Sequence, residues 1–180
     1  MAPVPVPRAA DAGHFRQVFS AEFAYVWATL RRLGVKDRDL EDVAQEVFLQ
    51  IYNNLHVYDA RRPIRPWLFA FAFRAASDYR RLARHRVEVI GQEADVSAPG
   101  PLAEEALSTI DEAKLVSDAL ESIDLDRRAI LLAYEVDELP MKEVATALGI
   151  ALNTAYSRLR VAREELAAAV RRQRVIRGES

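Results

Sequence analysis

The stretch MKEVATALGIALNTAYSRL, residues 141–159, carries the most specific structural signal in the C-terminal half of this 180-residue chain. Val144 and Ala145 fall on the inward face of a short predicted helix, and Ala145 is small enough for a second helix to cross closely. Gly149 can adopt the positive φ that ends a helix in a tight turn, after which Ile150 points back into the core. The pattern predicts a helix-turn-helix, the unit that places one helix in the major groove of DNA.

A second helix is expected to follow this turn, from about Thr154 to Arg172, with Asn153 or Thr154 as its N-cap. The small and apolar residues that would pack inward are Ala155, Leu159, Ala162 and Leu166. The polar residues that would face a groove are Tyr156, Ser157, Arg160 and Arg163, flanked by Arg158. An arginine in such a place reads guanine with two hydrogen bonds or clamps a phosphate. A helical hairpin with a merely basic face is the alternative interpretation.

The N-terminal half contains two further helical patterns. Residues 15–33 gather aromatic and aliphatic side chains on one side, and Gly34 follows as a C-cap. Apolar residues then recur at spacings of three and four from Leu40 to Leu55, which predicts an amphipathic helix that starts at Asp37 or Asp39. This half is therefore expected to be helical as well.

Aromatic residues occupy every second position from Trp67 to Phe73, and this period of two taken alone favours a strand. We predict a helix over residues 66–86 instead. Pro66 suits a first helical turn, the intervening alanines are strong helix formers, and neither a turn signal nor a partner strand follows. A strand is the alternative.

The net charge of −2 conceals two basic segments separated by an acidic one. Residues 61–86 contain eight arginines and one acid, and residues 154–177 contain seven arginines and two acids. Residues 87–126 contain eleven acids and one lysine. Solvated helix faces produce many charge runs, but this alternation suits phosphate neutralisation at two points on a duplex.

The expected fold class is all-α, with two small helical domains joined by a flexible acidic linker and a helix-turn-helix in the second domain. The linker is predicted where glycine and proline gather among acidic and small residues. The expected organisation is a disordered tail at 1–13, a helical domain at 14–87, the linker at 88–109, the helix-turn-helix domain at 110–172 and a tail at 173–180.

Composition argues against several other classes of protein. The chain has no cysteine and its three histidines are far apart, so neither a metal site nor a cofactor is expected. No stretch approaches the roughly 20 apolar residues of a membrane span, and no signal peptide is recognised, so a cytoplasmic protein without membrane insertion is expected. An enzyme acting on nucleic acid would need clustered carboxylates or an activated nucleophile, and no catalytic residue is predicted.

Three stretches together resemble the extracytoplasmic-function family of bacterial RNA polymerase sigma factors. Two of them, DLEDVAQEVFLQIYNNL at 39–55 and RRPIRPWLFAFAFRAASDYRR at 61–81, resemble that family's region two. The third, LPMKEVATALGIALNTAYSRLRVAREEL at 139–166, resembles its region four. The resemblance extends from about residue 15 to residue 170. It implies a protein without catalysis of its own, which binds core RNA polymerase and directs it to promoter DNA through two separated elements.

The resemblance also implies site residues and a partner. The residues that would dock on the polymerase are Asp39, Asp42, Gln45 and Glu46. The residues that would contact the −10 element are Tyr58, Arg61, Arg62, Arg65, Trp67 and Arg74. The residues that would contact the −35 element are Asn153, Thr154, Tyr156, Ser157, Arg158, Arg160 and Arg163. An anti-sigma factor is the further partner that the family implies.

The chain departs from the family pattern at a few of these positions. Asparagine is frequent in the family where this chain has Arg74, and lysine is frequent at Tyr156, so the preferred promoter bases are expected to differ. A ligand-controlled repressor or activator is the alternative function, with the N-terminal helices as an effector domain. Such a domain should enclose an apolar pocket, whereas here an arginine-rich segment continues the aromatic helix.

Overall fold

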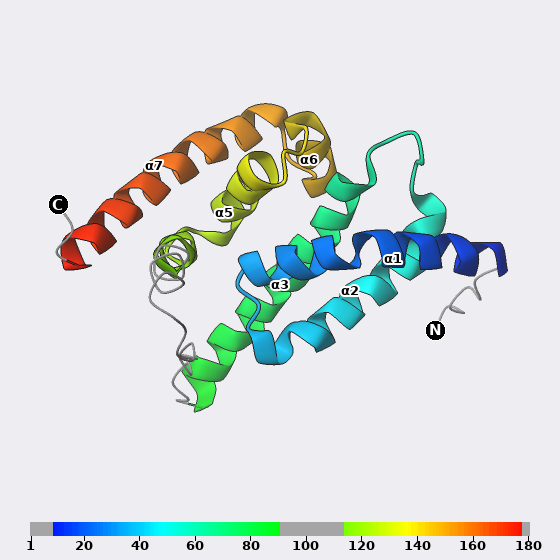
Figure 1. Ribbon diagram of the computed structural model, residues 1–180, viewed down its shortest axis with the longest axis horizontal. Coiled ribbons are helices and arrows are strands. Elements are labelled where there is room, and N and C mark those ends of the chain that lie inside the picture. Colours follow the sequence, from blue (N-terminus) through cyan, green and yellow to red (C-terminus); the bar gives the residue numbers. More distant parts are fainter. Residues whose placement is uncertain (1–8, 91–113, 178–180) are drawn as a thin grey trace, which may run out of the picture.

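The computed structural model describes residues 9–90 and 114–177, and within those ranges it consists of helices joined by short turns and loops (Figure 1). No strand occurs within them, which confirms the all-α class. The elements are α1 (Ala9–Arg32), η1 (Asp37–Asp39), α2 (Leu40–Asn54), η2 (Leu55–Val57), α3 (Ile64–Ile90), a helix at 114–121, α5 (Leu125–Leu131), η3 (Leu132–Val136), α6 (Met141–Leu148) and α7 (Leu152–Arg177). Residues 91–109 of the predicted linker lie outside the described residues.

The helix boundaries differ from the predicted ones at both ends of the chain. Helix α1 begins at Ala9, so residues 9–13 of the predicted tail are helical, and α7 includes residues 173–177 of the other tail. Helix α3 extends to Ile90 and takes in the first three residues of the predicted linker. Sequence periodicity marks the buried part of a helix, and exposed ends carry little of that signal.

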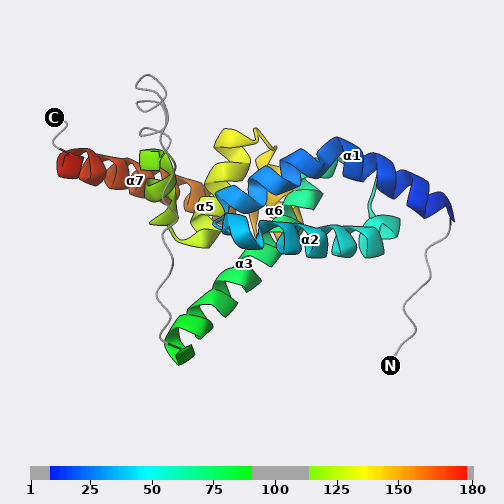
Figure 2. The same ribbon diagram turned by 60° about the horizontal axis from the view of Figure 1, so that its bottom comes forward.

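The N-terminal helices form one packed unit. Helices α1 and α2 lie side by side and antiparallel, and α3 contacts both of them (Figures 1 and 2). Val26 and Leu30 of α1, Val47 and Ile51 of α2, and Phe69 of α3 are completely buried between these helices. Burial of such large apolar side chains contributes roughly 1.5–3 kcal/mol each and holds the unit together.

The alternating aromatic residues are on α3, so the helical interpretation is correct and the strand alternative is wrong. On a helix, residues four apart are neighbours, and the rings of Trp67 and Phe71 do meet, with centroids 4.7 Å apart at 73°. Phe69 and Phe71 are buried, whereas Trp67 and Phe73 are half-buried against the same core. Because α3 is buried on most of its circumference in this stretch, its apolar residues do not repeat clearly at the helical period. A period of two can therefore occur on a helix as well as on a strand.

The C-terminal helices contain the predicted helix-turn-helix in α6 and α7. Val144 and Ala145 are buried, and Gly149 adopts φ 68° and ψ 31°, the left-handed conformation predicted for it. The predicted N-cap of the second helix is wrong. The N–H of Ile150 bonds to the Ala145 carbonyl at 3.0 Å, which closes the turn, and Ala151 already accepts the first helical bond of α7. The second helix therefore begins at Leu152, ahead of both predicted capping residues.

The two units pack against each other, and one continuous cluster of buried apolar residues runs through both. Helix α6 of the helix-turn-helix contacts α3 of the N-terminal unit, as the views in Figures 1 and 2 agree. The predicted pattern of two helical regions is present. Their mutual packing was not predicted, and it fixes how the candidate binding surfaces face one another.

Candidate functional site

The acidic face of α2 is open to solvent. Asp42, Gln45 and Glu46 are exposed, and Glu46 accepts a hydrogen bond from the Gln50 side chain at 3.4 Å. Asp39 differs from the other three predicted docking residues, because it is half-buried and accepts a hydrogen bond from the Tyr79 hydroxyl at 2.7 Å. Burial and this carboxylate raise the pKa of Tyr79, so the hydroxyl stays protonated as the donor. Asp39 therefore has a structural role on the inner edge of this face.

An apolar groove of about 890 Å³ runs between α1 and α2 beside the acidic face. Its floor and walls include Phe19, Phe23, Phe48 and Leu49, and Gln45 lies on its rim. Phe23 and Phe48 are stacked with centroids 5.7 Å apart, yet Phe19 and Phe23 are 38% and 37% exposed. Helical periodicity predicts that the α1 aromatics lie on one side of the helix, but it does not show that this side is only partly covered. The groove adds an apolar surface to the acidic face.

The loop between η2 and α3 carries the first predicted −10 residues. The Arg61 guanidinium is 90% exposed and pairs with the Asp59 carboxylate at 2.9 Å, which lowers the pKa of Asp59. The Tyr58 hydroxyl donates to the Arg62 carbonyl, and the Tyr58 ring lies 5.1 Å from that of Trp67. These local bonds give the loop a defined conformation. Tyr58 and Trp67 thus form one aromatic pair at its base.

The remaining arginines of this region differ in their partners. Arg62 pairs with Glu143 of α6, its Nε donating at 2.9 Å. Arg65 pairs with Glu22 of α1 at 2.9 Å and lies over the Tyr25 ring at 5.0 Å. The exposed Arg74 lies over the Phe71 ring at 5.1 Å. The structure brings Tyr58, Arg61, Arg62 and Trp67 together at one end of α3, whereas Arg74 is two turns or more away along that helix.

The outer face of α7 is exposed as predicted. Asn153, Thr154, Tyr156, Ser157, Arg160 and Arg163 are all exposed, and the half-buried Arg158 pairs with Asp126 at 3.0 Å. Arg160 pairs with Glu164 one turn along the helix at 2.9 Å. Arg163 pairs with Glu135 of η3, its Nε donating at 2.7 Å. The predicted inward residues Ala155, Leu159 and Ala162 are buried and Leu166 is half-buried, so the assignment of the two faces is correct.

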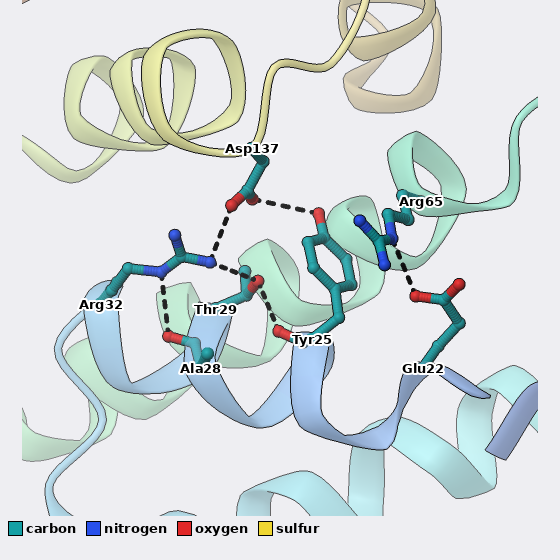
Figure 3. A network of polar contacts seen from close by, with 7 residues as sticks. All are labelled: Glu22, Tyr25, Ala28, Thr29, Arg32, Arg65 and Asp137. Atoms are coloured by element: carbon teal, nitrogen blue, oxygen red, sulfur yellow. Dashed lines mark hydrogen bonds and ion pairs between the residues drawn. The ribbon is translucent and has the colours of Figure 1, made fainter. Parts of the chain in front are cut away.

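A polar network, which no sequence pattern predicts, joins the two units. The Asp137 carboxylate, in the turn before α6, accepts hydrogen bonds from the Tyr25 hydroxyl at 3.2 Å and from Arg32 at 2.8 Å (Figure 3). Thr29 contacts the same arginine at 3.4 Å. Burial first, and the Asp137 carboxylate second, raise the pKa of Tyr25 far above its usual value. Tyr25 therefore remains a neutral donor.

Among residues 9–90 and 114–177, no group of three or more histidine, aspartate or glutamate side chains is arranged to hold a metal ion. The helices in the same ranges are all too short or too polar to span a bilayer.

Comparison with protein families identifies both units. Residues 19–86 match the family described as Sigma-70 region 2, and residues 113–166 match the family described as Sigma-70, region 4. The first match covers the acidic α2 face and the loop before α3. The second covers α5 to α7 as far as Leu166. The two candidate surfaces therefore lie in two regions that occur in the same order in sigma factors.

Individual relatives agree with this assignment. The chain is 32% identical over 163 residues to the ECF RNA polymerase sigma factor SigL of Mycobacterium tuberculosis, covering 90% of this chain and 92% of that protein. Its fold resembles CnrH in complex with the cytosolic domain of CnrY, with a TM-score of 0.62, 20% identity and coverage of 92% and 89% of the two chains. It also resembles the sigma factor RpoE in complex with the anti-sigma factor NepR from Bartonella quintana, with a TM-score of 0.71, 19% identity and coverage of 88% and 97%.

These matches do not favour a ligand-controlled repressor, and sigma factors as a family are not enzymes. The two matched regions occur in the same order as the motifs quoted from the sequence. The relatives also cover nearly the same part of the chain as those motifs. The chain belongs to the extracytoplasmic-function family of RNA polymerase sigma factors.

Proposed function

We propose that residues 14–87 of this sigma factor bind core RNA polymerase and the −10 element, and that residues 110–172 bind the −35 element. In this scheme Asp42, Gln45 and Glu46 present the polymerase-docking surface, and Asp39 supports it from the inner edge. The chain itself performs no catalysis, and it acts in the cytoplasm, where the transcription machinery operates.

The observation that carries the proposal is the exposed acidic face of α2 beside the aromatic groove. Carboxylates and an apolar surface side by side suit a partner helix that offers both basic and apolar side chains. The acidic residues lie opposite the buried Val47 and Ile51, so they are free of the packing role that the other face performs. A helix that only supported the hydrophobic core would not need an exposed apolar groove beside its acidic face.

Promoter contact is assigned to two surfaces. At one end of α3, Arg61 and Arg62 would hold phosphates while Tyr58 and Trp67 provide aromatic faces for an unstacked base. On α7, the six exposed residues at 153–163 would enter a major groove, with Arg158 toward the backbone. The arginines in both places are already paired with carboxylates of the chain, so a phosphate that uses the same donors must replace those partners.

An anti-sigma factor is the further partner that we propose. Two proteins of similar fold, CnrH and RpoE, were solved in complex with the cytosolic domain of CnrY and with NepR. The apolar groove and acidic face of α2 offer this chain a surface that such a partner would need to cover.

The test is reconstitution with purified bacterial core RNA polymerase. We expect the chain to co-elute with core enzyme in size-exclusion chromatography at moderate salt. We also expect it to direct transcripts with discrete 5′ ends from genomic DNA fragments, which core enzyme alone would not produce. If the chain fails to bind core enzyme but shifts duplex DNA by itself, the assignment of the docking surface is wrong and the chain acts at DNA without polymerase.

A further inference from the structure

Arg128 of α5 is a buried charge that has no part in the proposed function. The residue is 1% exposed, and its Nε and Nη1 atoms have no hydrogen-bond partner among the described residues. Its Nη2 donates to the Ile123 carbonyl at 3.4 Å, which is a long bond. A buried charged donor without an acceptor destabilises a protein, so a partner of opposite charge is expected at this place.

A second guanidinium group, that of Arg80 on α3, lies beside the first. A Cβ atom built on Gly34 would lie 3.2 Å from Nη1 of Arg128 and 3.8 Å from Nη1 of Arg80. Both atoms therefore border the same point after the end of α1, close enough together for one tetrahedral anion to contact both. Gly34 has φ 97°, and its lack of a side chain leaves room for the two guanidinium groups.

The carboxylates around this pair do not neutralise it. Glu121 and Asp124 favour the charged form of Arg128, yet within the described ranges neither forms an ion pair with it or with Arg80. Glu121 pairs with Lys36 at 3.8 Å, and the Asp124 side chain accepts from a backbone N–H in the first turn of α5 at 3.1 Å. Burial first, and the Arg80 charge second, lower the pKa of Arg128 to about 10, so the residue is still charged at neutral pH. An excess of positive charge therefore remains between the two guanidinium groups.

We propose that Arg128 and Arg80 form a binding site for a small phosphoryl anion, either inorganic phosphate or the phosphate group of a small monoester. Planar guanidinium groups match the oxygens of a phosphate, and two of them can donate to it from different directions. Arg80 is half-buried and forms the solvent side of the site, whereas Arg128 forms its inner end. A DNA duplex is too wide to bring a backbone phosphate to the buried Arg128. The site is therefore separate from the proposed promoter-binding surfaces.

Anion binding is tested with the full chain by isothermal titration calorimetry with inorganic phosphate, at an ionic strength held constant with sodium chloride. We expect saturable binding at one site, and a rise in Tm with phosphate that sodium chloride of equal ionic strength does not produce. Arg80→Ala should raise the dissociation constant at least about tenfold, because charged hydrogen bonds to the anion are lost. Arg128→Met should abolish binding, and the variant should fold because it removes a buried charge that has no partner in the chain.

The matched control is Arg81→Ala, which makes the same change of charge at the next residue of α3. Arg81 is exposed and pairs with Asp78 at 3.0 Å, so it takes no part in the proposed site. Its dissociation constant for phosphate should equal that of the wild type. The site is refuted if Arg81→Ala weakens binding as much as Arg80→Ala, or if Arg80→Ala keeps the wild-type constant. Circular dichroism shows that each variant compared is folded.

A second titration, with adenosine monophosphate, distinguishes the two sources of the anion. Binding of both ligands, weakened in Arg80→Ala, would mean that the site accepts the phosphate group of a larger molecule. Binding of inorganic phosphate alone would mean that only the free anion fits. If neither ligand binds to the wild-type chain, the proposal is wrong. The titrations use neither polymerase nor DNA, so a failed co-elution with core enzyme would overturn the proposed function without affecting this result.

Discussion

Replacement of Asp42 and Glu46 by arginine is expected to weaken the binding of core RNA polymerase by at least about a hundredfold, which corresponds to roughly 3 kcal/mol. Both side chains are exposed on α2 beside the aromatic groove. Reversal of charge removes two attractive contacts with a basic partner and puts two repulsive ones in their place. Binding of labelled variants to core enzyme, measured by titration at moderate salt, gives the two dissociation constants.

The control for this experiment makes the same change of net charge elsewhere. Asp118→Arg with Glu138→Arg alters two exposed acids outside α2, and its affinity for core enzyme should be close to that of the wild type. Equal weakening by both double variants would mean that polymerase senses the total charge of the chain. No weakening by Asp42→Arg with Glu46→Arg would place the docking surface away from α2.

Phe69→Ala is expected to lower the free energy of unfolding by about 3–5 kcal/mol, the usual effect of removing a buried phenylalanine side chain. Phe69 has no exposed surface and lies where α3 packs on α1 and α2. The loss combines the transfer of the ring to solvent with the cavity left among neighbours on three helices. Urea unfolding followed by circular dichroism measures it.

Phe73→Ala provides the comparison, because Phe73 is one helical turn away and only half-buried. Its effect should be clearly smaller than that of Phe69→Ala. The two rings lie on nearly the same face of α3, so the difference in their burial sets the difference between the two losses. Equal losses would therefore contradict the packing of α3, while a graded pair of values would support it.

Local sequence signals predicted those helices and turns whose own residues form a recognisable pattern. The helix-turn-helix depends on Ala145 and Gly149, and both have the burial and the backbone conformation that their residue types suggested. The helix at the alternating aromatics was predicted because alanine and proline favoured it over a two-residue period. In both places, the helix propensity of the residues and their packing in the core favour the same local structure.

The sequence does not show which residues far apart along the chain come into contact in the fold. Tyr25 and Asp137 are 112 positions apart, and neither stands in a motif that pairs it with the other. The burial of Arg128 was not foreseen either, because arginine is a surface residue in most settings. The groove was missed for a related reason. Periodicity shows which face of α1 is apolar, but the shape of α2 decides how much of that face is covered.

The internal ion pairs of the arginines that we propose to bind promoter DNA have a consequence for how DNA affinity responds to salt. An arginine that is free in solution displaces a condensed counterion when it reaches a phosphate, and each such event steepens the fall of affinity with ionic strength. Where a phosphate takes the donors that Arg62, Arg158 and Arg163 now give to Glu143, Asp126 and Glu135, those carboxylates attract cations from solution. Cation uptake by the carboxylates offsets cation release from DNA. The number of arginines at the interface would therefore overstate the salt sensitivity of this sigma factor.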